Sequence, residues 1–167
     1  NNIFTGERLK VAVVQGNIAQ EKKWDPALRR SIIDKYEVLT IASAKDSPDL
    51  IVWPETSVPG FLETEEDLFQ RVKGVARSAH AALLVGEPRQ EAGNEDIYYN
   101  SATLFDKDGK LVASYDKIHL VPFGEFIPAK GVFSFVEKFT KLTIGNFSAG
   151  KEYTVFKFTV DRSRKTD

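Results

Sequence analysis

The 167-residue sequence contains no cysteine, no methionine and only two histidines. Without cysteine, the chain has no disulfide, no thiolate metal site and no thiol nucleophile within its boundaries. Two histidines are too few for a histidine-based metal centre, and we expect neither a metal nor a cofactor. Because the sequence starts at Asn1 and lacks methionine, we expect that a preceding segment of the translation product has been removed.

The sequence also lacks long apolar runs and an excess of either charge. Its longest apolar run, Ala81–Val85, is far shorter than the roughly 20 residues that span a bilayer. The 23 lysines and arginines against 24 aspartates and glutamates leave a net charge of −1, without a basic stripe, so we expect no nucleic-acid partner. With 42% hydrophobic and 28% charged residues, residues 1–167 have the composition of a single folded domain.

Apolar segments alternate with amphipathic ones in the first half of the chain. The continuously apolar stretches, which predict buried strands, are Leu9–Gln15, Leu50–Trp53 and Ala81–Val85. Helical spacing of apolar residues predicts a helix between the first two strands, with Asp25 as its N-cap and its end near Lys45. A second helix is expected before the third strand, with Thr64 opening a capping box.

The second half of the chain has mainly strand patterns. Tyr98–Phe105 and Leu111–Tyr115, joined by a glycine-containing turn, predict a β-hairpin. Thr154–Val160 alternates polar and apolar residues and predicts a further strand. Strands that alternate with helices and are followed by a hairpin are typical of the α/β class, with helices covering a mixed sheet.

Glu55 is the first candidate for chemistry. It follows the strand expected at Leu50–Trp53, after Pro54, at the kind of strand end where open α/β sheets bind ligands. A carboxylate that is partly desolvated in such a position has a raised pKa and can exchange protons near neutral pH. On position alone, the alternative is a surface glutamate that merely follows a strand.

Lys117 and Glu125 are the next candidates. Lys117 follows a predicted strand and is flanked by apolar residues, so it is a fixed cation that could stabilise an oxyanion. Glu125 follows Gly124, where the backbone can bend and point the carboxylate inward. The segment Tyr115–Pro128 is too aromatic and too rich in proline for an ordinary solvent loop, and its other interpretation is a packed connector.

Together these segments resemble the nitrilase, or carbon–nitrogen hydrolase, superfamily, whose catalytic set is glutamate, lysine and cysteine. Trp53–Glu55 resembles the segment that carries the general base, and Tyr115–Leu120 resembles the segment that carries the lysine. Three more specific stretches are similar to the periplasmic nitrilase-like domain of the apolipoprotein N-acyltransferases. These stretches are Val14–Ile18, Lys23–Asp25 and Val121–Pro128.

The resemblance extends from about Leu9 to Phe158 and implies a nitrilase-like α-β-β-α sandwich, incomplete at its C-terminal end. In that family the nucleophilic cysteine lies on the strand after the one expected at Thr154–Val160. Transmembrane segments flank the domain in the family. Since this sequence ends at Asp167, before that cysteine, we expect the chain by itself to be inactive.

The resemblance also implies a role for each matching residue. Glu55 would be the general base for the cysteine thiol, and Lys117 would stabilise the tetrahedral oxyanion. Glu125 matches a further functional carboxylate that would orient Lys117, and Trp24 matches a position on the lipid-binding side of the site. The other residues expected to contact substrate are Phe123, Gly124 and Phe126.

The implied reaction transfers an acyl chain from a phospholipid to the N-terminal α-amino group of a diacylglyceryl-cysteine apolipoprotein, through a cysteine thioester. The implied location is the bacterial inner membrane, with this domain facing the periplasm. Gly131–Phe147 is rich in aromatic and aliphatic residues. Such a segment is either core packing or a lid that enters the bilayer interface.

Other functions stay open on the sequence. A soluble nitrilase-type amidase or carbamoylase would share Glu55 and Lys117 but would lack membrane segments. A catalytically silent nitrilase-like interaction module is disfavoured by the retained Glu55, Lys117 and Glu125, because buried charges without a task are costly. A glycosidase that uses Glu55 and Glu125 as its carboxylate pair has no supporting motif.

Overall fold

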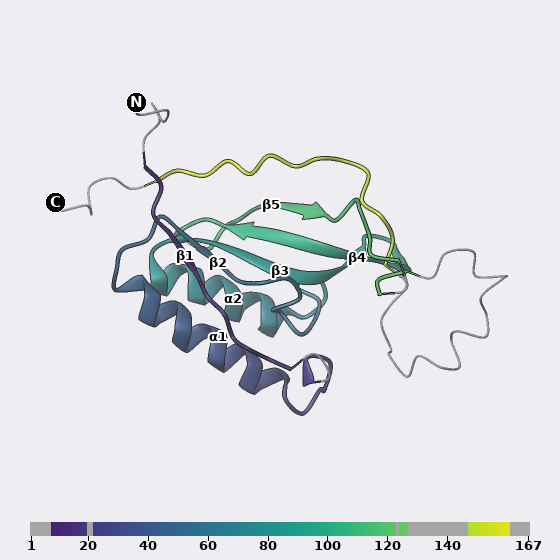
Figure 1. Ribbon diagram of the computed structural model, residues 1–167, viewed down its shortest axis with the longest axis horizontal. Helices are drawn as coiled ribbons and strands as arrows, with labels where there is room; N and C mark the ends of the chain where they lie inside the picture. The colour runs from purple at the N-terminus through teal and green to yellow at the C-terminus, as the bar shows by residue number, and fades with distance from the viewer. Residues whose placement is uncertain (1–7, 20–21, 123, 127–146, 161–167) are drawn as a thin grey trace.

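The computed structural model describes residues 8–19, 22–122, 124–126 and 147–160 (Figure 1). Strands and helices follow one another in the order β1, α1, β2, α2, β3, β4, β5. They are β1 Val11–Val13, α1 Arg29–Ala44, β2 Leu50–Val52, α2 Glu66–Ala79, β3 Ala82–Glu91, β4 Asn94–Phe105 and β5 Leu111–Asp116. This order confirms the α/β class that the sequence predicts.

The strands form one sheet in sequence order, with β1 at one edge and β5 at the other. β1, β2 and β3 are parallel, because α1 and α2 each return the chain to the end of the sheet at which the preceding strand began. β3, β4 and β5 are antiparallel neighbours, because short turns join them. The sheet is therefore mixed, as expected, and the C-terminal ends of β2 and β5 lie at the same end of the sheet.

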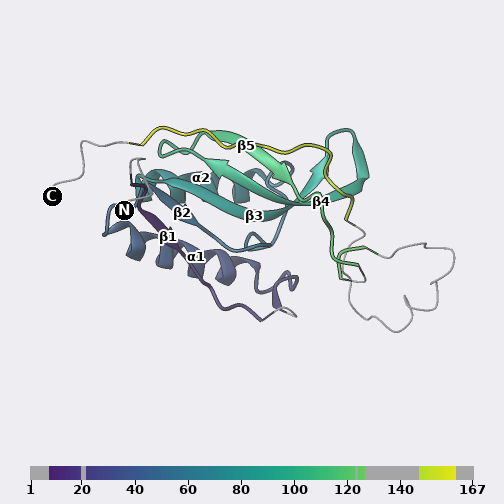
Figure 2. The ribbon, with the colours of Figure 1, turned by 45° about the horizontal axis from the view of Figure 1, so that its top comes forward.

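Both helices cover one face of the sheet, as Figures 1 and 2 show. The core lies between these helices and the sheet, where Leu83 and Val85 of β3 are fully buried. Tyr36 of α1 stacks on Trp53 with ring centroids 4.9 Å apart, and Trp53 Nε1 donates a hydrogen bond of 2.8 Å to Thr40 Oγ1. Trp53 follows β2 directly, so these contacts with α1 fix the direction in which the chain leaves that strand.

Several expected boundaries differ from the structure. The N-cap of α1 is Leu28 rather than Asp25, whose carboxylate instead accepts the Ala27 N–H within a preceding turn. The capping box at Thr64 is wrong, because α2 begins at Glu66 and its N-cap, Glu65, makes no side-chain cap bond. The Glu65 carboxylate is used elsewhere, since it accepts the N–H of Phe61 over 2.9 Å.

The strand expected at Thr154–Val160 is also wrong. The segment is extended and passes β5 (Figures 1 and 2), but within the described residues it forms no backbone ladder with a strand. Thr154 Oγ1 donates to the Ser114 carbonyl over 3.2 Å, and Tyr153 and Val155 are exposed. The expected lid lies outside the described residues apart from Phe147. No helix in the described part of the chain has both the length and the apolar character to cross a membrane.

Candidate active site

Glu55 and Lys117 lie at the same end of the sheet, after strands that are far apart in the sequence. Glu55 follows β2 in the loop after Trp53, and Lys117 follows β5 directly. The Lys117 backbone N–H donates to the carbonyl of Asn100 in β4 over 2.8 Å, which extends the β4–β5 pairing by one residue. Glu125 comes from the turn after Lys117, where its N–H donates to the Val121 carbonyl over 2.9 Å.

The three side chains that the sequence singled out meet at this place and are called here the Glu55–Lys117–Glu125 cluster. Lys117 Nζ lies 3.0 Å from Glu55 Oε1 and 3.0 Å from each carboxylate oxygen of Glu125. Their side chains are 60%, 29% and 13% exposed for Glu55, Lys117 and Glu125. Glu125 is therefore the inner carboxylate and Glu55 the accessible one.

The exposure of Glu55 corrects one expectation, that of a carboxylate desolvated at the strand end. Its side chain emerges at the rim of the sheet, and no described segment covers its outer side. What holds Glu55 is hydrogen bonding on its inner side, from Lys117 and from a group that the sequence reasoning missed.

That group is Asn100, which is buried in the middle of β4 with 6% exposure. Its Nδ2 donates to Glu55 Oε1 over 2.7 Å and to Glu125 Oε1 over 2.5 Å. Asn100 therefore bridges the two carboxylates, and the ammonium of Lys117 also contacts both of them. The available signal was an amide residue inside a strand whose neighbours are mostly apolar, because such a group is buried only with hydrogen-bond partners.

The contacts within the cluster shift the pKa values of two of its members, Lys117 and Glu125. Partial burial tends to lower the pKa of Lys117, but its hydrogen bonds to Glu55 and Glu125 outweigh burial and hold that pKa above its ordinary value. Partial burial tends to raise the pKa of Glu125, but bonds from Val121 N–H, Asn100 and Lys117 hold that pKa below its ordinary value. At neutral pH the cluster therefore contains the Lys117 ammonium beside the inner carboxylate of Glu125, and Glu55 is the more accessible of the two carboxyl groups.

The loop that carries Glu55 is fixed against β3. The Gly86 carbonyl accepts the N–H groups of Ser57 and Val58 over 2.8 and 3.0 Å. Gly86 has no space for a side chain, because a Cβ there would lie 2.5 Å from the Pro54 carbonyl oxygen and 2.7 Å from the Glu55 Cα. Close backbone approach at Gly86 thus sets where Glu55 leaves the sheet.

A hollow of about 200 Å³ adjoins the cluster. Glu55, Asn100 and Lys117 form its polar part, and its apolar walls include Trp53, Leu84, Val85, Ala102 and Tyr115. A ligand in this hollow would have an apolar surface on one side and the acid, amide and ammonium groups on the other. Such a lining is typical of small-molecule sites, which combine apolar walls with a few convergent polar groups.

The structure describes three of the four residues that are expected to contact substrate. Trp24 is 41% exposed and lies in the turn next to Lys23, whose Nζ is 3.3 Å from the Glu55 carbonyl oxygen. Gly124 and Phe126 are half-buried in the turn that carries Glu125. Phe123 lies outside the described residues. No described group of histidine, cysteine, aspartate and glutamate side chains is arranged to hold a metal ion.

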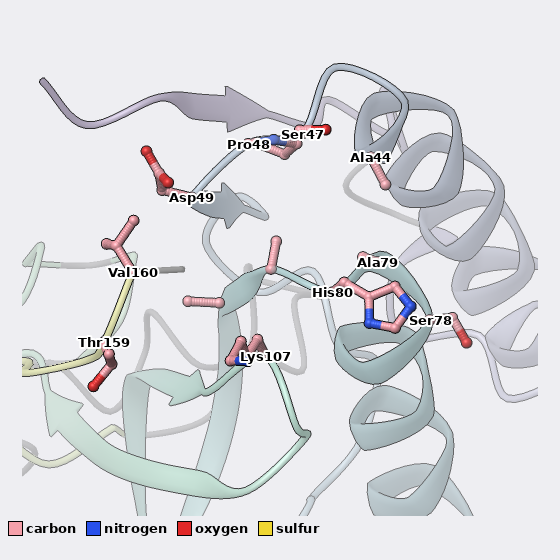
Figure 3. A pocket seen from close by; sticks show the side chains of 12 residues that line it. Ala44, Ser47, Pro48, Asp49, Ser78, Ala79, His80, Lys107, Thr159 and Val160 are labelled. Carbon is pink, nitrogen blue, oxygen red and sulfur yellow. The ribbon is translucent and has the colours of Figure 1, made fainter. Parts of the chain in front are cut away.

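A second hollow, of about 250 Å³, lies at the opposite end of β2 (Figure 3). Asp49, His80 and Lys107 are among the residues that line it. Asp49 precedes β2, whereas Glu55 follows it, and no sequence-predicted site residue that the structure describes lines this second hollow. The chemistry suggested by the sequence is therefore confined to the other end of the sheet.

Comparisons with known proteins identify the family of the chain. The carbon–nitrogen hydrolase family model matches residues 10–160. An apolipoprotein N-acyltransferase of Geobacter metallireducens is 40% identical over 149 residues, which are 88% of this chain and 28% of that protein. One of Brucella suis biovar 1 is 45% identical over 126 residues, which are 72% of this chain and 24% of that protein. The chain thus spans about a quarter of the length of these curated relatives.

The fold is also found among solved structures. A doubly substituted amidase from Nesterenkonia sp. AN1, in complex with acrylamide, superposes with a TM-score of 0.60 at 18% sequence identity. The match covers 91% of this chain and 52% of the amidase, and it confirms a nitrilase-like fold. Because the family match extends over nearly the whole sequence and includes the segments that bring Glu55 and Lys117 together, the chain belongs to the carbon–nitrogen hydrolase family.

Proposed function

We propose that this chain supplies the base and the oxyanion-stabilising lysine of an apolipoprotein N-acyltransferase. The observation that carries the proposal is the contact of Lys117 Nζ with both Glu55 and Glu125, in a chain that is 40% identical to a named apolipoprotein N-acyltransferase. The reaction would move an acyl chain from a phospholipid to the N-terminal amine of a diacylglyceryl-cysteine lipoprotein. The protein would act at the bacterial inner membrane, with this domain on the periplasmic side.

The first half-reaction uses a cysteine that the family places after the described residues. Glu55 accepts the thiol proton, and the thiolate attacks the ester carbonyl carbon of the phospholipid. Lys117 stabilises the oxyanion of the tetrahedral intermediate, since an ammonium already held by two carboxylates does not reorganise as charge develops. The lysophospholipid oxygen leaves with the proton from Glu55, and the acyl chain stays on the sulfur as a thioester.

The second half-reaction returns the cysteine to its thiol. Glu55 takes a proton from the acceptor's α-ammonium group, so that the free amine attacks the thioester carbonyl. The carbon–sulfur bond breaks, and the thiolate recovers the proton held by Glu55. Glu55 then takes the second proton that the nitrogen loses and passes it to water, so that an amide-linked acyl chain is the product. The apolar walls of the hollow next to Lys117 support an acyl ligand, because an alkyl chain that binds there is transferred from water to an apolar surface.

Substitutions at the cluster test this proposal in the protein as its gene encodes it. With a phospholipid donor and a diacylglyceryl peptide acceptor in detergent, product is measured as the mass increase of one acyl chain. We expect Glu55→Gln to lower kcat by about 10²- to 10⁴-fold, the typical contribution of a general base. Lys117→Met should lower kcat by about 10²- to 10³-fold, as the loss of an oxyanion-stabilising group does.

The control is Glu66→Gln, an exposed carboxyl group in the first turn of α2 that contacts Gln70. It should retain wild-type transfer. Wild-type transfer by Glu55→Gln would contradict the proposal. Release of ammonia from simple amides, without acyl transfer, would favour the amidase alternative, and the absence of both activities would favour the silent module. Because the chain contains no cysteine, we expect no transfer from residues 1–167 by themselves.

A further inference from the structure

We propose that Asp116 is a positioning residue for Lys117, and that it acts from the opposite face of the sheet through a clamp formed with Arg89 and Ser101. The clamp is not part of the Glu55–Lys117–Glu125 cluster, and none of its side chains reaches the reacting groups. The inference rests on the proposed catalytic role of Lys117, whose place it would fix.

The strand register places the clamp on the helix-covered face. Val85 of β3 belongs to the core under the helices, and Glu87, two residues further on, points to the same face. Glu87 pairs with Ser101, and Ser101 pairs with Asp116. Residues that are directly paired share a face of the sheet, so Asp116 points toward the helix side. The adjacent Lys117 points to the other face, where its Nζ meets Glu55.

Three strands contribute to the clamp. The Arg89 guanidinium of β3 donates to both carboxylate oxygens of Asp116, with Nε 2.8 Å from Oδ1. Ser101 Oγ of β4 donates to the same Oδ1 over 2.7 Å. Arg89 also lies over the Tyr99 ring, 5.0 Å from its centroid. A planar guanidinium that is held by two hydrogen bonds and a ring fixes both the place and the orientation of the carboxylate.

The position of Lys117 shows what the clamp would fix. β5 is the edge strand, and Lys117 lies just beyond its last residue. Its backbone is held by the Asn100 carbonyl on one side and by the Gly150 N–H, which donates to the Lys117 carbonyl over 2.9 Å, on the other. Rotation of the Asp116 peptide would turn the Lys117 side chain away from Glu55. The clamp opposes this rotation, because Asp116 cannot turn without breaking its bonds to Arg89 and Ser101.

The Arg89–Asp116 pair is also better shielded than an ordinary surface ion pair. The two side chains are 24% and 22% exposed. Between α1 and α2, the Arg71 guanidinium donates to one carboxylate oxygen of Glu37 and one of Asp34. The side chains of Arg71, Asp34 and Glu37 are more exposed, at 31%, 52% and 43%. This arrangement has no contact with the candidate active site, so its loss should affect stability alone.

Substitutions in the protein as its gene encodes it separate a positioning role from a purely structural one. Asp116→Ala should lower kcat by about 10- to 100-fold, the effect of displacing a catalytic group by a fraction of an ångström to an ångström, with KM within about threefold of wild type. Arg89→Lys, which retains the charge but loses the planar fork, should lower kcat in the same direction and by less. Arg71→Ala is the matched control and should leave kcat at the wild-type value.

A second measurement does not depend on activity. Trace acetylation of amines with isotopic acetic anhydride, resolved by mass spectrometry, gives the labelling rate of each lysine in the folded protein. We expect Lys117 to react several-fold faster in Asp116→Ala, because its ammonium leaves the two carboxylates that protect it. Lys110, exposed in the turn before β5, is the internal reference and should be unchanged.

The outcomes are distinct. Wild-type labelling of Lys117 and wild-type kcat in folded Asp116→Ala and Arg89→Lys would overturn the clamp. If Asp116→Ala fails to fold, Arg89→Lys and Asp116→Asn decide in the same two measurements. If the wild-type protein transfers no acyl chain but Lys117 labelling still rises in the variants, the proposed function fails and the clamp stands.

Discussion

Glu87 is a buried carboxyl group of β3 that takes no part in the proposed chemistry. Its side chain is 1% exposed, and burial raises its pKa to about 8, although hydrogen bonds from Thr103 and from the Leu62 N–H oppose that rise. The nearby charges act in opposite directions, because Glu63 raises this pKa further and Arg89 lowers it. Glu87 is therefore protonated in the folded state at neutral pH.

This protonation predicts a fall in stability with rising pH. Below about pH 4.5 the carboxyl is neutral in both states, and its contribution to the free energy of unfolding is fully present. Between that pH and about 8 only the unfolded chain ionises, so the free energy of unfolding decreases by up to about 1.4 kcal/mol per pH unit. Urea unfolding from pH 5 to 8 should show this slope in the wild type and a reduced slope in Glu87→Gln. An unchanged slope in Glu87→Gln would contradict the burial argument, and Glu66→Gln is the exposed control.

The residues of the site differ in how far they could be predicted. Glu55, Lys117 and Glu125 stand out because each follows a recognisable strand end or turn, and their segments resemble a known family. Asn100 does not stand out, because its importance comes from the register of β4 against β5 and from the turn that brings Glu125 back. Asn100 contacts Glu55 and Glu125 across 45 and 25 positions of sequence. No pattern in the residues around Asn100 predicts contacts at such separations.

At the scale of elements, the contact of β3 with the loop after β2 leaves no space for a side chain at Gly86. Gly86→Ala would place a methyl group against the backbone of Pro54 and Glu55, so the loop or the strand must move. We expect the free energy of unfolding to fall by about 1–3 kcal/mol, as overpacking commonly causes. Acyl transfer should fall by about 100-fold, because Glu55 moves with its loop.

Gly74→Ala is the matched control for Gly86→Ala. Gly74 lies in α2, and a Cβ there meets nothing within 4 Å. Alanine should stabilise the helix by about 0.5–1 kcal/mol and leave transfer unchanged. Urea unfolding and the acyl-transfer assay are run on both variants. A Gly86→Ala protein as stable and as active as the Gly74→Ala protein would show that this approach of backbones does not position Glu55.

The elements themselves are predictable where their sequence is continuously apolar. Leu50–Val52 is continuously apolar and was found as a strand with little error. For β3 the sequence predicts a strand only as far as Val85, because Glu87 and Arg89 in the second half of the strand interrupt the apolar run. Thr154–Val160 has the alternation of a strand because one side of it faces the domain, yet alternation does not supply a hydrogen-bonding neighbour.

At the scale of the whole molecule, one face of the sheet is covered by helices while β1 leaves apolar side chains in the open. Ala12 packs against the core, whereas Val11 and Val13, on the other face, are 45% and 76% exposed. Among the described residues β1 is also an edge strand, and no described strand pairs with its outer side. Apolar side chains beside an unpaired edge are a common cause of self-association.

We therefore expect residues 1–167, produced by themselves, to self-associate through β1. Val13→Lys should reduce association, because a charged side chain beside an edge opposes pairing with a second copy. Val38→Lys is the control, since Val38 is 67% exposed but lies on α1, away from any strand edge. Sedimentation velocity over a range of concentrations measures the effect. If β1 is responsible, only Val13→Lys shifts the distribution toward monomer; if the wild type is monomeric at high concentration, the open edge has no such consequence. Equal shifts in both variants would mean that net charge, rather than the edge of the sheet, governs association.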